Sequence, residues 1–386
     1  FVAGIAGARP ANERPAAASA AAPAEDGPLV VLIAGEPSGD ALGARLMAAL
    51  KTKTGGKIRF AGVGGDKMAA QGLVSRFPMS DIAVMGLFEV LPRLPTILVR
   101  IAETADWAER LCPDAVVTID SPDFNFRVAA RLRKRLKGKG FPLIHYVAPT
   151  VWAWRPKRAR AVARLYARLM TLLPFEPPYF EREGLKAAFV GHSVLESGAG
   201  EGNGSAFRDR HAISPRAPVL CVLPGSRRSE IRALLPVFGE ALARIAAQIP
   251  DLRVVVPTIP ALAADIRAAT RTWPGNPLVI EAEGEKHDAF AAAQAALAAS
   301  GTVSLELALA GTPHVVAYRV NPVTAWLARR LVRVRFVNLV NLVLDRAVVP
   351  ELLQDECTGA TLADAVLTLF KDPRAREMQR AAFAEA

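Results

Sequence analysis

The sequence lacks a stretch that could serve as a membrane-spanning helix. The longest uncharged stretch, residues 289–305, is interrupted by polar and small residues such as Gln294, Ser300 and Gly301. A spanning helix needs about 20 predominantly apolar residues. Any contact with a membrane is therefore expected to be peripheral.

Patterns that hold metals or form disulfides are also missing. The three cysteines, Cys112, Cys221 and Cys357, are far apart and odd in number, so they indicate neither a disulfide framework nor a CxxC metal site. The five histidines are scattered, with no HxxxH or HExxH spacing. We expect no metal and no cofactor, and a reducing, cytoplasmic setting. The G-x-S-x-G turn of many serine hydrolases does not occur either.

Positive charge is in excess, because 48 basic residues face 37 acidic ones, a net charge of +11. Such a balance favours an anionic partner: a nucleic acid, a phosphorylated substrate or an acidic lipid surface. The basic segments 127–139 and 155–168 suggest the first of these. They lie on predicted helices and carry no aromatic RNP-type motif, so we expect no nucleic-acid partner. A salt-sensitive gel shift would favour that alternative class.

Short apolar runs alternate with helical periodicity along most of the chain, which predicts an α/β fold with parallel strands buried on both faces. We expect helices near residues 156–168, 229–248 and 303–310. The glycine- and serine-rich segment 196–205 is typical of a linker. The predicted organisation is a disordered leader (1–28), a first doubly wound domain (29–195), the linker (196–205), a second doubly wound domain (206–357) and C-terminal helices (358–386) that pack back on the first domain.

Ligands bind at the carboxyl ends of the strands in such sheets, so the loops after strands are the places to look for chemistry. The loop GEPSGD after the first strand places Ser38, Gly39 and Asp40 at a helix start, where Ser38 or Asp40 can cap the helix and a phosphate can bind. It is neither GxGxxG nor a Walker loop, which argues against a dehydrogenase or an NTPase.

A second loop in the first half, SPDFN, brings carboxylates to a strand end. Asp120 and Asp123 lie there with Asn125 just beyond. A carboxylate in this place can accept a proton from an attacking hydroxyl, although Asp123 can equally cap the helix that follows. Further along, Trp152 and Trp154 precede a basic run that begins at Arg155. Tryptophans can pack on a sugar or an acyl chain while cations hold a phosphate, or they can be core residues beside a solvated helix.

Two loops of the second half resemble phosphate-binding turns. In LPGSRRSEI, Gly225, Ser226 and Arg227 lie where a helix begins, so backbone N–H groups and a guanidinium can hold a diphosphate. In SGTVSLE, Ser300, Gly301 and Thr302 begin another helix, with Glu306 about one turn into it, where its carboxylate can bind a ribose. Either loop alone could be simple capping, but together they indicate a nucleotide-binding domain.

The order of these motifs resembles that of one enzyme family. The chain contains GEPSGD, GVGGDKM, MGLFEVLPRLP, IDSPDFNFR, HYVAPTVWAWRPKR, LPFE, FVGHSV, LPGSRRSEI, SGTVSLELALAG and FVNLVNL, all between residues 29 and 356. This set closely resembles the lipid-A-disaccharide synthases. The resemblance implies a GT-B-type glycosyltransferase, with two Rossmann-like domains facing a cleft. Its expected substrates are UDP-2,3-diacylglucosamine and 2,3-diacylglucosamine 1-phosphate, joined with inversion and without a metal.

The resemblance also implies roles for individual residues. Asp123 is the expected base, and Ser38, Gly39, Asp40, Asn125, Trp152 and Arg155 are expected to bind the acceptor. The donor is expected at Gly225, Ser226, Arg227, Ser300, Gly301, Thr302 and Glu306, with Asn338 or Asn341 lining its site. Pro37 departs from the family pattern, which we expect to have a small residue there.

The apolar segment 85–101 predicts peripheral contact with the inner face of the inner membrane through Leu87, Phe88 and Leu91. A core helix is the alternative. The rival enzymes are another GT-B protein, such as a cell-wall glycosyltransferase or a UDP-sugar 2-epimerase, and an epimerase would not need an acyl-binding surface. The sequence leaves homo-oligomerisation open.

Overall fold

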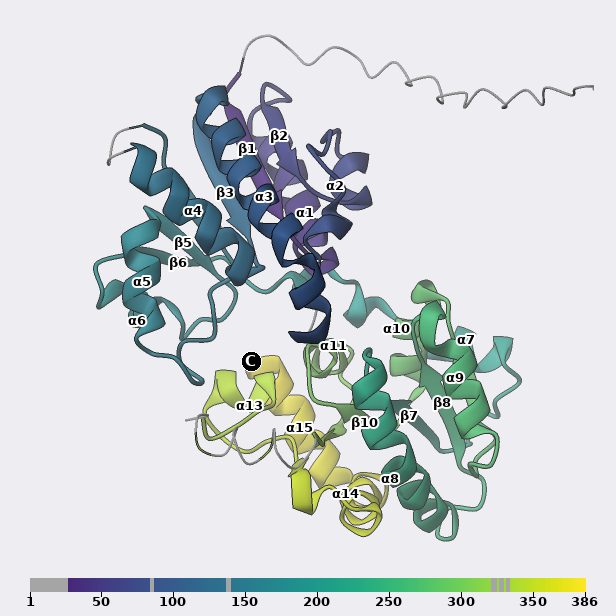
Figure 1. The fold of residues 1–386 in the computed structure, drawn as a ribbon. Helices are drawn as coiled ribbons and strands as arrows, with labels where there is room; N and C mark the ends of the chain where they lie inside the picture. The colour runs from purple at the N-terminus through teal and green to yellow at the C-terminus, as the bar shows by residue number, and fades with distance from the viewer. Residues whose placement is uncertain (1–26, 84–86, 137–139, 321–324, 326–329, 331–333) are drawn as a thin grey trace, which may run out of the picture. The chain divides into compact units, whose positions relative to one another are not determined.

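The structure is a computed structural model that describes residues 27–83, 87–136, 140–320, 325, 330 and 334–386, with side chains described for all of these except 87–92 and 283. The predicted leader, residues 1–28, lies outside this range except for its last two residues. The chain divides into two compact units, with the division after Ile144. Figure 1 labels most of the helices and strands.

The first sheet has six strands in the order β2-β1-β3-β4-β5-β6. They are β1 (Leu29–Ala34), β2 (Arg59–Val63), β3 (Ala115–Ile119), β4 (Leu143–Tyr146), β5 (Arg168–Thr171) and β6 (Lys186–Phe189). Strand β1 pairs in parallel with β2 and β3, and β5 pairs in parallel with β6. The connecting helices are α1 (Pro37–Lys53), α2 (Asp66–Ala70), α3 (Leu87–Leu111), α4 (Pro122–Leu136), α5 (Arg158–Leu165) and α6 (Pro177–Glu181).

The second sheet also has six strands, in the order β12-β11-β10-β7-β8-β9, and every neighbouring pair is parallel. The strands are β7 (Val219–Leu223), β8 (Arg253–Pro257), β9 (Leu278–Ile280), β10 (Ala295–Ala299), β11 (His314–Tyr318) and β12 (Glu351–Leu353). The chain builds β7, β8 and β9 outward in one direction, then returns to place β10 on the other side of β7. The order reverses at this point, so the sheet has a topological switch between β7 and β10.

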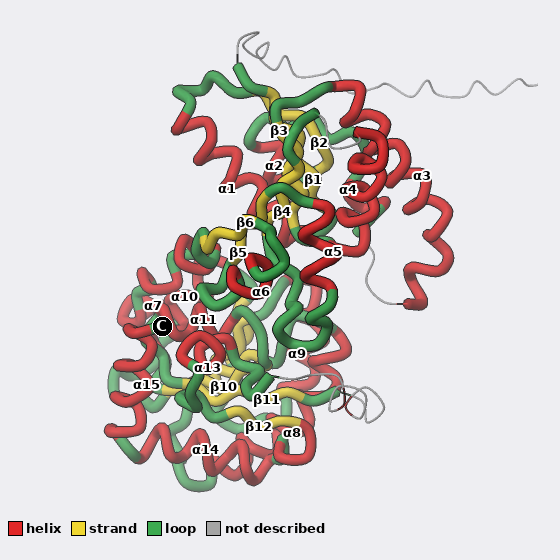
Figure 2. Tube along the Cα trace, turned by 90° about the vertical axis from the view of Figure 1, so that its left-hand side faces the viewer, coloured by secondary structure: helices red, strands yellow, loops and turns green. Residues whose placement is uncertain are grey.

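Helices cover both faces of the second sheet, as Figures 1 and 2 show. They are α7 (Gly204–Arg210), α8 (Arg228–Ala246), α9 (Pro260–Thr270), α10 (Glu283–Ala292), α11 (Val303–Leu309), α13 (Leu339–Leu344), α14 (Gly359–Lys371) and α15 (Pro373–Glu385). Four short 3₁₀ turns complete the described elements: η1 (Met79–Asp81), η2 (Ser193–Glu196), η3 (Ala199–Glu201) and η4 (Gln354–Glu356). The doubly wound α/β architecture expected from the alternating pattern is confirmed.

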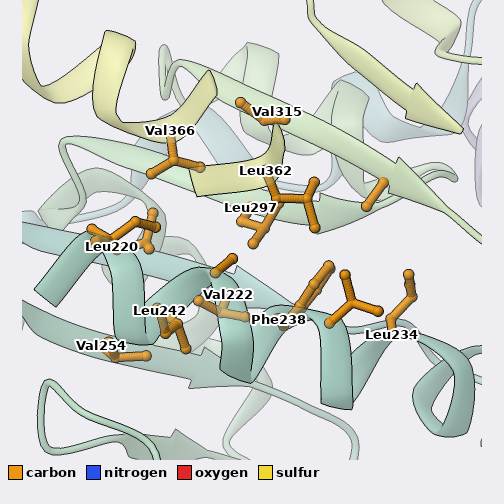
Figure 3. Close-up of a cluster of buried hydrophobic side chains, with 14 of the residues drawn as sticks. Leu220, Val222, Leu234, Phe238, Leu242, Val254, Leu297, Val315, Leu362 and Val366 are labelled. Atoms are coloured by element: carbon orange, nitrogen blue, oxygen red, sulfur yellow. The ribbon is translucent and has the colours of Figure 1, made fainter. Parts of the chain in front are cut away.

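The two faces of the second sheet carry separate apolar cores. Successive side chains of a strand point to opposite faces. Leu220 and Val222 of β7 therefore join α8 and α14 in one core, which Figure 3 shows. Phe238 is completely buried in it. Val219, Cys221 and Leu223 join the other core, which includes Phe207 and Phe290. Covering both faces leaves the strand ends as the exposed parts of this sheet.

The predicted helices are present, with bounds that differ by a few residues. The helices expected at 229–248 and 303–310 are α8 and α11, but the one expected at 156–168 is shorter, because β5 begins at Arg168. The expected C-terminal helices are α14 and α15. Helix α14 supplies Leu362, Val366 and Leu369 to the core beside α8. Packing of these helices on the first domain stays a prediction.

The glycine-rich segment 196–205 is ordered and packs on α10. It holds η3 and the start of α7, where the side chain of Asn203 accepts a hydrogen bond from the backbone N–H of Ala206. A Cβ atom at Gly202 would lie 2.2 Å from the carbonyl oxygen of His287, and one at Gly204 would lie 2.5 Å from that of Ala291. These two glycines thus allow close packing of backbone on backbone. The predicted domain boundary at this segment stays a prediction.

Candidate active site

The switch point of the second sheet holds a cavity of about 490 Å³. Loops that follow adjacent strands on opposite sides of a switch point diverge to opposite faces and leave a crevice between them. The cavity is lined by residues that follow β7, β8, β9 and β10. Seven of the residues predicted for the donor line it: Gly225, Ser226, Arg227, Ser300, Gly301, Thr302 and Glu306. The topology thus brings together the two loops that the sequence singled out.

The β7–α8 loop forms one wall through a glycine turn and the start of α8. Gly225 has φ +115°, a conformation that L residues rarely adopt, so only glycine fits without strain. Arg227 is the N-cap residue of α8, and Glu230 lies in the first turn. The N–H groups of Ser226 and Arg227 point to the Glu230 carboxylate, with N–O distances of 3.3 Å each. The guanidinium of Arg227 contacts the other carboxylate oxygen at 2.8 Å.

The β10–α11 loop forms the opposite wall with small side chains. Ser300, Gly301 and Thr302 are small enough to leave the cavity open, and a Cβ atom added at Gly301 would meet nothing within 4 Å. Glu306 lies one turn into α11 and forms an ion pair with Lys286 of α10. Both charged side chains line the cavity. The loop therefore leaves space for an anion. It also supplies one carboxylate, that of Glu306, which can bind hydroxyl groups.

A third wall follows β8 and β9, and the sequence analysis did not select it. Thr258, Ile259, Ile280 and Glu281 line the cavity here. The backbone N–H of Thr258 donates to Ile280 O at 2.8 Å, which joins the two strand ends. The Thr258 Oγ1 atom is buried and has no hydrogen-bond partner among the described residues. These loops also follow strands, but they lack the glycines and cations that drew attention to the other two.

The charged groups around the cavity are paired with one another. Arg227 pairs with Glu230, and Lys286 pairs with Glu306. Glu281 pairs with Arg267 of α9. Each cation that lines the cavity thus has a carboxylate partner at its rim or wall. A bound diphosphate would compete with those carboxylates for the two cations.

Asn338 and Asn341 lie outside the lining of this cavity and are buried, at 1% and 0% exposure. Asn338 caps α13 by accepting the N–H of Val340 at 2.8 Å. Asn341 donates to Val349 O and to Glu351, and accepts from the N–H groups of Val348 and Val349 at 2.9 Å each. The two side chains hold the segment between α13 and β12 in place. The donor contact expected of them stays a prediction.

In the first sheet, the backbone of the β3–α4 turn is strained just before the predicted base, Asp123. Asp120 and Ser121 both have positive φ, +51° and +41°, which non-glycine residues seldom adopt. Asp123 is exposed in the first turn of α4, and Asp120 Oδ2 accepts a hydrogen bond from Ser38 Oγ at 3.3 Å. The turn therefore places the two carboxylates, and Ser38 from α1, at the carboxyl end of the sheet.

Asn125 is fully buried and fastens this turn. Its side-chain amide donates to Asp120 O at 2.8 Å and to Ile119 O at 3.1 Å. The side chain thus holds the backbone that carries Asp120 and precedes Asp123. The acceptor contact expected of Asn125 stays a prediction.

The expectation that Ser38 or Asp40 caps the first helix is wrong. Helix α1 begins at Pro37, and its N-cap is Glu36, with no side-chain cap bond. Asp40 is 4% exposed, and its carboxylate accepts the N–H groups of Gly65 at 2.7 Å, Lys67 at 3.0 Å and Met68 at 3.1 Å. It caps α2, a helix that packs beside α1. A one-dimensional pattern assigns a cap to the nearest helix start, whereas the fold brings a second start closer.

Trp152 and Arg155 lie in the second unit, in the loop before α5. The indole N–H of Trp152 donates to Glu176 at 3.1 Å, and its ring packs edge-on against Phe175. Burial raises the pKa of Glu176. Hydrogen bonds from the backbone of Leu173, the indole of Trp152 and the backbone of Leu172 favour the charged form and oppose part of this rise. The Arg155 guanidinium stacks 4.0 Å from the centre of the exposed Trp154 ring.

The predicted membrane contact falls on side chains outside the described set, namely Leu87, Phe88 and Leu91. Further along α3, Leu98 and Val99 are 51% and 62% exposed. Arg100, in the same segment, pairs with Asp81 at 2.7 Å and with Glu103 at 2.6 Å, so its charge is compensated. Among helices formed by described residues, none is both long and apolar enough to cross a membrane.

The described residues contain no group of three or more His, Cys, Asp or Glu side chains placed to hold a metal ion. All three cysteines are free thiols, with Cys112 exposed and Cys221 and Cys357 buried.

Solved structures of low sequence identity share the fold. The UDP-GlcNAc 2-epimerase of Neisseria meningitidis, solved with bound UDP-GlcNAc, superimposes with a TM-score of 0.61 at 13% identity, covering 92% of this chain and 97% of that one. The MurG protein of Acinetobacter baumannii gives a TM-score of 0.56 at 16% identity, covering 93% and 95%. These likenesses confirm the GT-B-type architecture.

Sequence comparison is more specific. The family model described as lipid-A-disaccharide synthetase matches residues 30–385. The lipid-A-disaccharide synthase of Rhodospirillum centenum is 59% identical over 351 residues, which cover 91% of this chain and 87% of that protein. The one from Paramagnetospirillum magneticum is 53% identical over 355 residues, covering 92% and 90%. Since the match spans nearly the whole described chain and includes both sheets, the chain belongs to the lipid-A-disaccharide synthase family of glycosyltransferases.

Proposed function

We propose that the protein transfers the diacylglucosamine unit of UDP-2,3-diacylglucosamine to 2,3-diacylglucosamine 1-phosphate, giving the β-1,6-linked disaccharide 1-phosphate and UDP. The observation that carries the proposal is the cavity at the switch point of the second sheet. A glycine turn, a helix start and an arginine converge there on a carboxylate, in the arrangement that an anionic ligand requires. Membership in the family supplies the substrate class.

The donor is assigned to residues 206–357. Its diphosphate would bind at the N–H groups of Ser226 and Arg227 and at the Arg227 guanidinium. Its ribose would lie near Glu306, whose carboxylate can accept hydrogen bonds from both hydroxyls. The nucleobase would then occupy the third wall, between Thr258 and Ile280. This assignment uses all three walls described above and places the positive charge of Arg227 against the leaving diphosphate.

The acceptor is assigned to residues 29–195, with Asp123 as the base. The Asp123 carboxylate would take the proton from the 6-hydroxyl of the acceptor. The oxygen of that hydroxyl would at the same time bond to C1 of the donor sugar. The C1–oxygen bond to UDP breaks in the same displacement, so the anomeric configuration inverts. Asp120 is the rival base, because it lies on the same turn. Ser38 and Gly39 would hold the acceptor phosphate, while Trp152 and Arg155 would contact its sugar.

Peripheral attachment to the inner face of the inner membrane would bring both acylated substrates to the protein. The exposed apolar side chains of α3, Leu98 and Val99, support this placement. Vesicle flotation tests it. Polar replacements of Leu87, Phe88 and Leu91 in a folded protein should reduce flotation, and unchanged flotation would rule out this segment as the contact.

The reaction is tested by incubating the protein with the UDP-diacylglucosamine donor and the monosaccharide phosphate acceptor and analysing the products by mass. The expected product is a disaccharide monophosphate, with UDP released in equal amount. Conversion of UDP-GlcNAc without an acceptor would instead assign the protein to the epimerases that share its fold. If neither assay gave a product, that result would also contradict the proposal.

A further inference from the structure

In the structure, the carboxylate of Glu230 occupies the loop assigned above to the donor diphosphate. Glu230 Oε2 lies 3.3 Å from the backbone nitrogens of both Ser226 and Arg227, and Oε1 lies 2.8 Å from Arg227 Nη1. The same two N–H groups and the same guanidinium are assigned above to the diphosphate of the UDP-sugar. The carboxylate is mostly buried, with the Glu230 side chain 18% exposed, whereas the Arg227 side chain is 60% exposed. All three residues line the cavity.

A glutamate at the third position of a helix commonly bonds back to the N-cap N–H, and α8 has this capping box. Two contacts of Glu230 go beyond it. The carboxylate also accepts the N–H of Ser226, which precedes the N-cap, and it pairs with the guanidinium. Three donors thus surround two oxygens of one anion, as they would surround the oxygens of a phosphate.

The three hydrogen bonds to the Glu230 carboxylate differ in length. Its two bonds to backbone N–H groups are longer than the usual 2.7–3.2 Å range of N–H···O bonds, while the bond to Arg227 is of ordinary length. The backbone bonds are therefore the weaker part. A phosphate oxygen, which is not tethered to the helix, could approach those N–H groups more closely.

Gly225 makes the room that the carboxylate uses. A Cβ atom at this position would lie 2.7 Å from Glu230 Oε2 and 3.0 Å from Glu230 Cβ. The glycine therefore permits the turn and also the entry of the Glu230 side chain into it.

We propose that Glu230 is a built-in substitute for the donor diphosphate: its carboxylate fills the anion loop of the free protein and has to leave when a diphosphate binds. The inference rests on the proposed donor site. It makes Glu230 a residue that lowers affinity for every ligand that enters the loop with a phosphate. Displacing the carboxylate costs free energy whether it moves into water or stays nearby as a like charge. A ligand without a phosphate does not enter the loop and avoids that cost.

The test is Glu230→Gln, which keeps the length of the side chain and an acceptor oxygen for the capping bond but removes the charge. Isothermal titration calorimetry with UDP and with uridine compares a ligand that enters the loop with one that does not. We expect UDP to bind about five- to tenfold more tightly to the variant, the size of effect expected for removing one like charge from a partly exposed anion site. The affinity for uridine should not change.

The matched control is Glu385→Gln, which changes the net charge equally at an exposed ion pair with Arg346, away from the cavity lining. It should leave both affinities unchanged. A second variant, Glu230→Ala, removes the carboxylate and the cap together. It should also bind UDP more tightly, and agreement between the two variants would tie the effect to the charge and not to the capping bond.

Two results would overturn the inference. Unchanged affinity for UDP in Glu230→Gln would make the residue a helix cap only. Weaker binding of UDP would mean that Glu230 orients Arg227 for the ligand. Failure of the wild-type protein to bind UDP would instead contradict the proposed function, so the two failures are distinguishable.

Discussion

The loop after β1 and the loop after β7 share a local plan, a strand that ends in a glycine turn and a helix with an acidic residue in its first turn. In both, a side chain lies close to where the Cβ atom of a non-glycine residue would be. A Cβ atom would lie 2.7 Å from Ser121 Oγ at Gly35 and 2.7 Å from Glu230 Oε2 at Gly225. The acidic residues then differ. Asp40 turns away from its loop and caps α2, whereas Glu230 turns into its loop.

In these two loops, the position of the first-turn carboxylate determines whether the loop is open or already contains an anionic group. In the first sheet, Asp40 serves the fold, and the carboxylates proposed for chemistry come from the next loop along, at Asp120 and Asp123. In the second sheet, the Glu230 carboxylate caps the helix and also lies in the proposed anion site. Stability and ligand binding should therefore be separable in the first loop and linked in the second.

The largest expected effect separates chemistry from binding. Asp123→Asn keeps the size of the side chain but removes the basic oxygen, so turnover should fall by roughly 10²–10⁴. The affinity for UDP should stay near the wild-type value in calorimetric titration, because UDP is assigned to the second sheet. Asp120→Asn is the comparison, and a loss of turnover in that variant alone would move the role of base to Asp120.

The next effect concerns the cation of the second loop. Arg227→Ala should weaken UDP binding by about 1.5–3 kcal/mol, because a partly buried diphosphate loses a charge-assisted contact. Arg228→Ala is a matched control, since Arg228 is adjacent, does not line the cavity and pairs with the exposed Asp265. The control should change the affinity by at most about 0.5 kcal/mol. Equal losses in the two variants would remove Arg227 from the site.

The structural role of the first-loop carboxylate gives a third test. Asp40→Ala leaves three backbone N–H groups at the start of α2 without their acceptor, so the free energy of unfolding should fall by about 2 kcal/mol. Chemical denaturation measures this loss, and UDP titration of the folded variant should be unchanged. Wild-type stability in the variant would mean that water or another group replaces the carboxylate.

The smallest effect is expected from the helix start of the second loop. Glu230→Ala should lower the free energy of unfolding by about 1 kcal/mol, the usual size for a lost cap. Because the same change is expected to tighten UDP binding, saturating UDP should recover part or all of the lost stability. If stability and affinity fell together, the contrast between the two loops would not hold.

The sequence predicted the fold class because the central strands of both sheets are buried on two faces, and these strands therefore read as unbroken apolar runs. It also predicted the Gly225–Arg227 and Ser300–Glu306 segments, since two loops with glycine and small polar residues at helix starts in one half of the chain together indicate phosphate binding. That these two loops share a cavity follows from the strand order, which no local pattern contains. The third wall at Thr258 and Ile280 was missed because its residues are ordinary for a strand end.

Other features could not be predicted because the same residue types occur in two different structural roles. The glycines of segment 196–205 are as frequent as in a flexible linker, but Gly202 and Gly204 allow contact with the backbone of α10. An asparagine near a strand end looks the same whether it binds a ligand or fastens a turn. Asn125 and Asn341 fasten turns, and only their burial and partners reveal this.

The pairing of β7 with β10 also has a consequence for folding. The strands meet in the register Cys221 with Ala296, so the two walls of the cavity are far apart in the chain and meet only when this long-range pair has formed. Partly folded states without β10 have no complete site, and UDP would bind them poorly. A ligand at about 100 times its Kd would then stabilise the paired sheet by about 2.7 kcal/mol. Amide hydrogen exchange should therefore slow in the central strands of this sheet as well as in the loops that touch the nucleotide.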